Sequence, residues 1–113
     1  DELDSMGIIL DEFYIYYPQV ETINHTWMDF SKEIKNNKVQ AMIFTSPSAV
    51  RYFFSIMQKI LPNFKRYIEN IDALISIGPN TTKELHLKDI FPIESEEHTI
   101  KGTLQLAKRI FSK

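Results

Sequence analysis

The sequence predicts an α/β domain in which a parallel sheet is flanked by helices. Two stretches lead to this prediction: AMIFTSPSAV at 41–50 and LISIGPNTTKEL at 74–85 each pass from an apolar run through a turn to a helix start. Short apolar runs of this kind are typical of buried parallel strands. Strands that alternate with helices along a chain indicate a parallel sheet with helices on its faces.

The composition bounds the class of protein. A chain of 113 residues suffices for one domain, and its 43% hydrophobic and 25% charged residues are ordinary for a globular protein. The net charge of −2 argues against a nucleic-acid partner, and no apolar run approaches the length that spans a bilayer. The absence of cysteine excludes disulfides and thiolate chemistry and fits a cytoplasmic location.

The opening stretch, 3–17, is expected to form one strand, interrupted near Asp11-Glu12 and ended by Pro18. Its aromatic run, FYIYY, follows a shorter apolar run. Period-two alternation places Tyr14 and Tyr16 on the same face of the strand. This pattern alone is more typical of an amphipathic edge strand than of a functional site.

The next two helices follow from apolar spacing. The first is expected over 22–36, where apolar residues recur at helical spacing and His25 near its start reads as a surface or capping residue. A strand at 41–45 comes next, and Ser46-Pro47 then fits an N-cap followed by proline at the first helical position. The apolar stripe of this second helix is expected in the core: Val50, Phe53, Phe54, Met57 and Leu61. A short extra turn or helix is expected over 63–70.

The stretch from 73 to 85 is expected to contain a second buried strand, at 73–77, which Gly78-Pro79 ends. Thr81 with Glu84 three residues later is a capping-box pattern, which predicts that a helix begins there. Two interpretations of this turn remain open. It is either an ordinary connection or a turn that holds a carboxylate or phosphate at a helix N-terminus.

The end of the chain is expected to add one strand and one helix. The strand lies at 90–94, and its internal Pro92 favours an edge position. Thr99 is expected to start the final helix, with one apolar face made by Ile100, Leu104, Ala107 and Phe111.

The motif search excludes several kinds of chemistry. No phosphate-binding GxxxxGK[ST] loop, dinucleotide-binding GxGxxG turn or GxSxG nucleophile elbow is present. The three histidines lack metal-ligand spacing, so we expect no metal site.

Hydroxyl-rich helix starts are what remain. In a parallel sheet these turns line up along the carboxyl edge, where such folds bind ligands. We therefore expect Ser46, Ser48, Asn80, Thr81 and Thr99 to share one rim. Nearby cations could add charge-assisted bonds to an anionic ligand: Arg51, Lys83 and Lys101.

The order of these motifs resembles that of a known family. FTSPSAVRYF, then ISIGPNTTKEL, then an acidic stretch that ends in HTIKG, resembles the C-terminal part of uroporphyrinogen-III synthases. The upstream GIIL and FYIY resemble the family's returning interdomain strand, whose characteristic tyrosine is matched by Tyr16. The resemblance covers essentially all 113 residues.

The resemblance implies a fold and a reaction. Family members have two flavodoxin-like domains and an active site between them. Without cofactor or metal, they cyclise the linear tetrapyrrole hydroxymethylbilane, with loss of water and inversion of the last ring. Residues 1–19 would be the returning strand and linker, and 20–113 part of a flavodoxin-like domain. The implied catalytic residue is Tyr16, and the implied substrate-binding residues are Ser46, Pro47, Ser48, Gly78, Pro79, Asn80, Thr81 and Thr99.

The sequence also departs from the family pattern. Family chains are longer, and one of their domains is assembled from both ends of the chain. Asn80 stands where a threonine is common, although Thr81 keeps a hydroxyl next to it. The alternative is a non-catalytic α/β binding or assembly module that associates with itself or a partner through an uncovered sheet edge.

Overall fold

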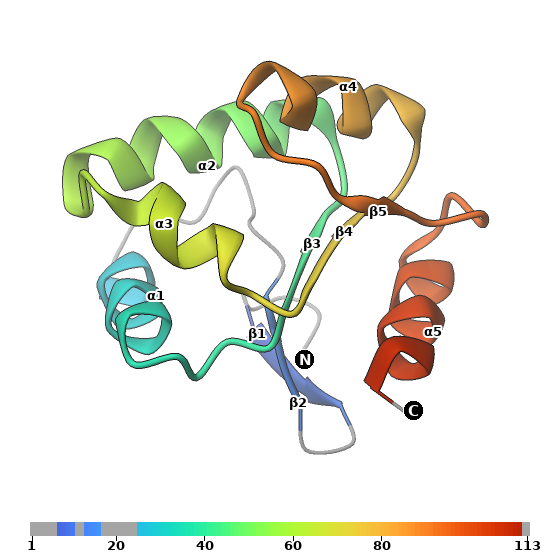
Figure 1. Ribbon diagram of the computed structural model, residues 1–113, viewed down its shortest axis with the longest axis horizontal. Helices are drawn as coiled ribbons and strands as arrows, with labels where there is room; N and C mark the ends of the chain where they lie inside the picture. Colours follow the sequence, from blue (N-terminus) through green and yellow to red (C-terminus); the bar gives the residue numbers. More distant parts are fainter. Residues whose placement is uncertain (1–6, 11–12, 17–24, 112–113) are drawn as a thin grey trace.

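The computed structural model describes the backbone of residues 7–10, 13–16 and 25–111 and the side chains of residues 30–111. Figure 1 shows its strands and helices. In chain order they are β1 (Gly7–Leu10), β2 (Phe13–Tyr16), α1 (His25–Lys35), β3 (Ala41–Phe44), α2 (Pro47–Ile60), α3 (Phe64–Glu69), β4 (Ala73–Ser76), α4 (Pro79–Leu87), β5 (Ile93–Glu94) and α5 (Ile100–Phe111).

The sheet has the strand order β1-β2-β3-β4-β5. β1 and β2 pair antiparallel, and β2 through β5 pair parallel. The register places Phe44 beside Ser76 and Ser76 beside Glu94, so that β3, β4 and β5 end at one edge. This arrangement confirms the predicted parallel sheet flanked by helices, with strands near 41–45 and 73–77.

The helices cover both faces of the sheet. Figure 1 shows α5 on one side and α1, α2 and α3 on the other. Met42 and Phe44 of β3 belong to the core cluster that includes residues of α1 to α4, whereas Ala41 and Ile43 pack with Ala107 of α5. All four β3 residues are buried, which explains the uninterrupted apolar run in the sequence.

The larger core is built around aromatic rings. Phe53 of α2 is fully buried and makes edge contacts with Phe30, Phe44, Phe54 and Phe64. The expected apolar stripe of α2 is confirmed, because Val50, Phe53, Phe54, Met57 and Leu61 are all buried in this cluster.

The strands differ from the prediction at both ends of the chain. The opening stretch forms the antiparallel pair β1 and β2 instead of one strand. The last strand is shorter than 90–94. The N–H of Ile90 bonds Leu85 O to close α4, and Pro92 has no N–H for a ladder, so only Ile93 and Glu94 pair. β5 does lie at the edge of the described sheet.

The helices also correct the sequence analysis. α4 begins at Pro79 with Gly78 as its N-cap, so the capping box predicted for Thr81 is wrong. Glu84 instead pairs with Arg51. The predicted helix at 63–70 is confirmed as α3. On α5 the buried face excludes Ile100, which is 42% exposed. The first helix begins at His25 in the structure, and 22–24 lie outside the described residues.

Replacing Gly102 of α5 with alanine should destabilise the domain. A Cβ at this position would lie 2.6 Å from Glu97 Cβ and 2.7 Å from the Glu97 carbonyl oxygen. The same carbonyl accepts a bond from Ser95 Oγ, so the turn cannot withdraw freely. Overpacking should outweigh the helix propensity of alanine, for a net loss of about 1–2 kcal/mol in the free energy of unfolding, measured in urea.

The matched control for this prediction is Gln105→Ala, an exposed position one turn later on α5. It should leave the urea midpoint almost unchanged, because no close contact is introduced there. Equal midpoints for Gly102→Ala and the wild type would contradict the steric argument.

Candidate functional site

Three helix starts meet at the carboxyl edge of the sheet. α2 follows β3, α4 follows β4, and α5 follows β5 after a short loop. Two backbone bonds extend the ladder toward this edge, from Ile77 N to Phe44 O at 3.0 Å and from Ser95 N to Ser76 O at 2.9 Å. The edge therefore gathers the three turns that the sequence predicted to lie on one rim.

The starts of α2 and α5 are capped by their own side chains. Ser46 Oγ accepts the N–H of Ala49 at 3.0 Å and lies 3.2 Å from the hydroxyl of exposed Ser48, with Pro47 at the first helical position. Thr99 Oγ1 accepts the N–H of Gly102 at 2.9 Å. The N-cap predicted at Ser46 is confirmed, and Thr99, expected to start the last helix, caps it from the position just before Ile100. A ligand at either start would compete with an internal acceptor.

The start of α4 differs because its N-cap is a glycine. Gly78 has an extended backbone and offers no side chain to cap the first turn. Pro79 at the first helical position has no N–H to offer, whereas exposed Asn80 and buried Thr81 each carry one. Thr81 is only 2% exposed as a whole residue, so Asn80 is the better placed of the two to meet a ligand. The α4 start is thus the one of the three that no side chain caps.

A close approach explains why position 78 is glycine. A Cβ there would lie 3.3 Å from Cγ of His98, whose ring covers the turn from the loop before α5. From the sequence, Gly78 was expected to end the preceding strand, and His98 was not among the predicted site residues. No local pattern pairs residues so far apart in the chain.

Thr82 is the residue that sequence reasoning missed. Its hydroxyl donates to Glu94 Oε1 at 2.7 Å, lies 3.1 Å from the Gly78 carbonyl oxygen and is bonded to the hydroxyl of Ser76. It therefore links α4 to β4 and β5 at the candidate site. The only local signal was a second threonine after Thr81.

The nearby cations are arranged unequally. Arg51 of α2 makes an ion pair with Glu84 of α4 at 2.9 Å, which ties the two helices together beside their starts. Lys83 and Lys101 are exposed to solvent. Arg51 is already paired with Glu84, and the two lysines are exposed to solvent. Backbone amides at the helix starts are therefore the donors that the fold itself holds in place.

Tyr16 ends β2, where its backbone pairs with Met42 of β3. Because β2 is parallel to β3, the end of β2 at Tyr16 faces the same edge of the sheet as the three turns. The structure describes only the backbone at this position, and the role of Tyr16 remains a prediction.

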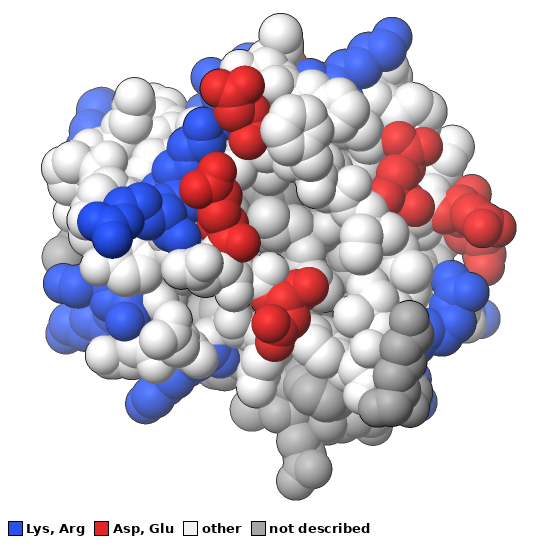
Figure 2. All heavy atoms as spheres, in the orientation of Figure 1, with Lys and Arg blue, Asp and Glu red and all other residues white. Residues whose placement is uncertain are grey.

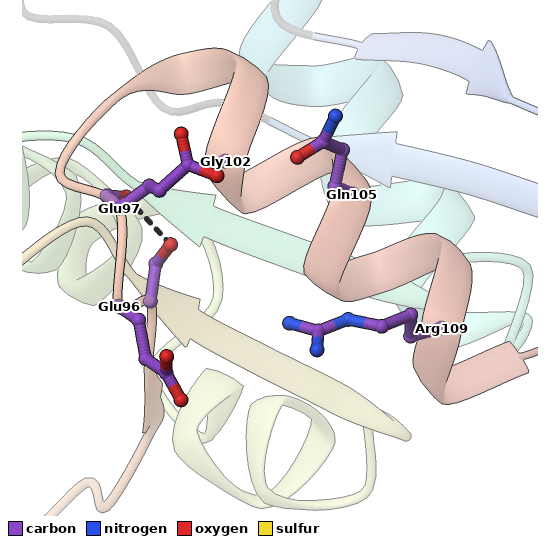
Figure 3. A pocket seen from close by; sticks show the side chains of 6 residues that line it. Glu96, Glu97, Gly102, Gln105 and Arg109 are labelled. Carbon is purple, nitrogen blue, oxygen red and sulfur yellow. Dashed lines mark hydrogen bonds between the residues drawn. The ribbon is translucent and has the colours of Figure 1, made fainter.

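A polar pocket of ≈ 370 Å³ lies beside this edge, between α5 and the loop that precedes it. Figure 3 shows the side chain of Arg109 extending from α5 toward the segment that carries Glu96. Figure 2 shows acidic side chains near β5 and this loop. The pocket is lined by Ser95, Glu96, Glu97, Gly102, Gln105 and Arg109, none of which was a predicted site residue.

Two further observations concern metals and membranes. Among the residues that the structure describes, no group of three or more histidine, aspartate or glutamate side chains could hold a metal ion. Within the same part of the chain, no helix has the length and apolarity needed to cross a bilayer.

Comparison with known proteins gives one match. The family model described as Uroporphyrinogen-III synthase HemD matches residues 1–105. This range includes the opening strands, the three helix starts at the carboxyl edge and half of α5. Neither the curated proteins nor the solved structures contain a significant match to the chain.

Proposed function

The chain belongs to the uroporphyrinogen-III synthase family, and we propose that it carries part of the machinery that cyclises hydroxymethylbilane to uroporphyrinogen III. The family match over residues 1–105 is the observation that supports this function. The reaction loses water, inverts the last pyrrole ring and belongs to cytoplasmic tetrapyrrole biosynthesis. In this proposal residues 1–19 are the interdomain strand and linker, and 20–113 are part of one domain.

The chemistry of the substrate fits the carboxyl edge. Hydroxymethylbilane carries eight carboxylates, and a helix N-terminus with free N–H groups favours an anion. The uncapped start of α4 is the first candidate to hold one of them, with the exposed Asn80 as backbone donor. Ser48 and Thr99 flank it with exposed side chains. Much of the catalysis would then consist of holding a flexible chain in the conformation that closes correctly.

Tyr16 is the proposed general acid. Phenols ordinarily have a pKa of about 10, so a tyrosine hydroxyl is protonated at neutral pH and can donate to the departing hydroxyl. The proton transferred to the leaving group completes the water that the reaction releases. Nothing in this step calls for a cofactor or a metal.

The chain should bind a polycarboxylate tetrapyrrole. We expect saturable quenching of porphyrin fluorescence when the 113-residue chain is titrated into uroporphyrin III, a stable oxidised form of the product with eight carboxylates. Binding should weaken as salt is raised, because exposed charges are screened. Coproporphyrin III, which has the same ring and four carboxylates, is the control and should bind more weakly.

Equal affinity for the two porphyrins would contradict recognition through carboxylates, and no binding of either would remove the proposed site.

The second candidate function is assembly through the edge strand. It is favoured by exposed apolar side chains along β5 and the segment before it, Phe91 at 73% and Ile93 at 45%. Concentration-dependent association in sedimentation velocity, without porphyrin binding, would favour that function instead.

A further inference from the structure

Two neighbouring pockets form a groove between α5 and the segment that contains β5. Each has a volume of ≈ 370 Å³, and they share Glu96 and Arg109. The first is the polar pocket described above. The second is lined by Ile93, Glu94, Glu96, Leu106, Arg109 and Ile110. The groove is therefore polar beside the start of α5 and more apolar toward its end. Sites for small molecules usually measure about 300–1,000 Å³, so this groove suits a small ligand.

The polar pocket has two walls that the fold holds in place. Gly102, Gln105 and Arg109 of α5 follow one another at intervals of three and four residues, so they lie on one face of the helix. The loop before α5 makes the other wall, where Ser95 Oγ donates to the Glu97 carbonyl oxygen at 2.6 Å. The walls meet at Gly102, where a Cβ would lie 2.6 Å from Glu97 Cβ.

Opposite charges face each other across this pocket without pairing. Figure 3 shows Arg109 extending from α5, and Glu96 from the loop, toward the space between the two walls. Glu97 lines the same pocket. Among the residues that the structure describes, no ion pair joins Arg109 to either glutamate. The charges are thus left to meet a ligand.

The class of ligand follows from this arrangement. A simple anion would be attracted by Arg109 and repelled by Glu96 and Glu97, and a simple cation would meet the reverse. A zwitterion satisfies both sides. A guanidinium binds a carboxylate through two parallel N–H···O bonds, and an ammonium group donates hydrogen bonds that a carboxylate accepts.

The second pocket adds an apolar surface beside these charges. Ile93 on β5 is 45% exposed, and Leu106 and Ile110 on α5 are half-buried. All three line the space next to Glu96 and Arg109. Covering them with an aliphatic group would remove apolar surface from water, which favours binding.

We propose that this groove binds a free α-amino acid with an aliphatic side chain. Arg109 binds the carboxylate of the ligand, Glu96 binds its ammonium group, and the aliphatic side chain packs in the apolar pocket. This site is separate from the helix starts proposed for the tetrapyrrole, and the inference does not rest on that function. Arg109 also lies beyond residue 105, where the family match ends.

Titration of the 113-residue chain with L-leucine tests the proposal, with binding followed by NMR of the labelled backbone amides. Saturable shifts are expected at residues 93–97 and 102–110. Leucinamide lacks the carboxylate and N-acetyl-leucine lacks the ammonium group. Each should bind about tenfold more weakly than leucine, because a hydrogen bond between charged groups is lost. Glycine, which lacks the aliphatic side chain, should also bind more weakly.

Two variants test the proposed contacts. Arg109→Gln and Glu96→Gln should each weaken leucine binding about tenfold, for the same reason. Both positions are exposed, so melting temperatures should change little. Arg109→Gln should hardly affect leucinamide, which has no carboxylate for Arg109 to bind. The matched control is Arg66→Gln, which removes the same charge from an exposed position on α3 and should leave leucine binding unchanged.

The outcomes separate this site from the proposed function. Losses in Arg109→Gln and Glu96→Gln, with wild-type affinity in Arg66→Gln, support the amino-acid site. The absence of saturable shifts with leucine, shifts confined to other residues, or equal affinities for leucine and its two analogues would overturn it. Displacement of leucine by uroporphyrin III would mean that the groove belongs to the tetrapyrrole site, and would also overturn the proposal. A chain that binds uroporphyrin III and not leucine overturns this inference alone.

Discussion

Phe53→Ala should remove a large part of the stability of this domain. The ring of Phe53 is fully buried, and its centroid lies 5.4 Å from the ring centroid of Phe44. It also makes edge contacts with the rings of Phe30, Phe54 and Phe64. Truncating a buried phenylalanine costs about 3–5 kcal/mol, because apolar surface is lost and the surrounding structure closes the cavity only in part. Domains of this size are stable by about 5–15 kcal/mol in total.

Urea unfolding followed by circular dichroism measures this effect. Ser55→Ala, at an exposed position on the same helix, is the matched control and should change the free energy of unfolding by less than about 0.5 kcal/mol. A loss below about 1 kcal/mol for Phe53→Ala would mean that the aromatic cluster does not pack as the structure shows.

Tyr16→Phe should slow cyclisation by at least about tenfold in a complete two-domain enzyme that carries this sequence, because general-acid help is typically worth about 10²–10⁴-fold in rate. The melting temperature should change little, since the ring is retained. Turnover of hydroxymethylbilane and thermal unfolding, measured on the same preparations, test this prediction.

Tyr14→Phe is the control, because it removes a hydroxyl from the same strand two residues earlier. It should leave turnover near that of the wild type. Unchanged turnover in Tyr16→Phe, or a loss fully explained by unfolding, would remove Tyr16 from the mechanism.

The predicted strands and helix caps that the structure confirms depend on short-range chemistry. AMIF at 41–44 is apolar at every position, which is what a strand covered on both faces requires. Ser46 before Pro47 was predicted as an N-cap because such a residue bonds an amide three residues away, and Thr99 bonds the amide of Gly102 in the same way. Contacts of that range can be predicted from neighbouring residues.

The errors show where local rules compete. Thr81 and Glu84 match a capping box, but proline is favoured at the first helical position and Gly78 is accepted as an N-cap, so α4 starts earlier. Glu84 is then free to pair with Arg51 of α2. Similarly, Ile90 closes α4 instead of extending β5, because Pro92 interrupts the ladder.

The sequence by itself determined the class of fold, the order of its elements and the edge where three helix starts would meet. Apolar periodicity and turn residues suffice for these, because each acts within a few positions of the chain. Only the tertiary structure decided which side chains surround each of the three starts, since the sheet brings these side chains together from distant parts of the chain. Thr82 reaches Glu94 and His98 covers Gly78 because parallel pairing places β4 beside β5 and the loop before α5 above both. These contacts join residues more than ten positions apart, and no local pattern specifies them.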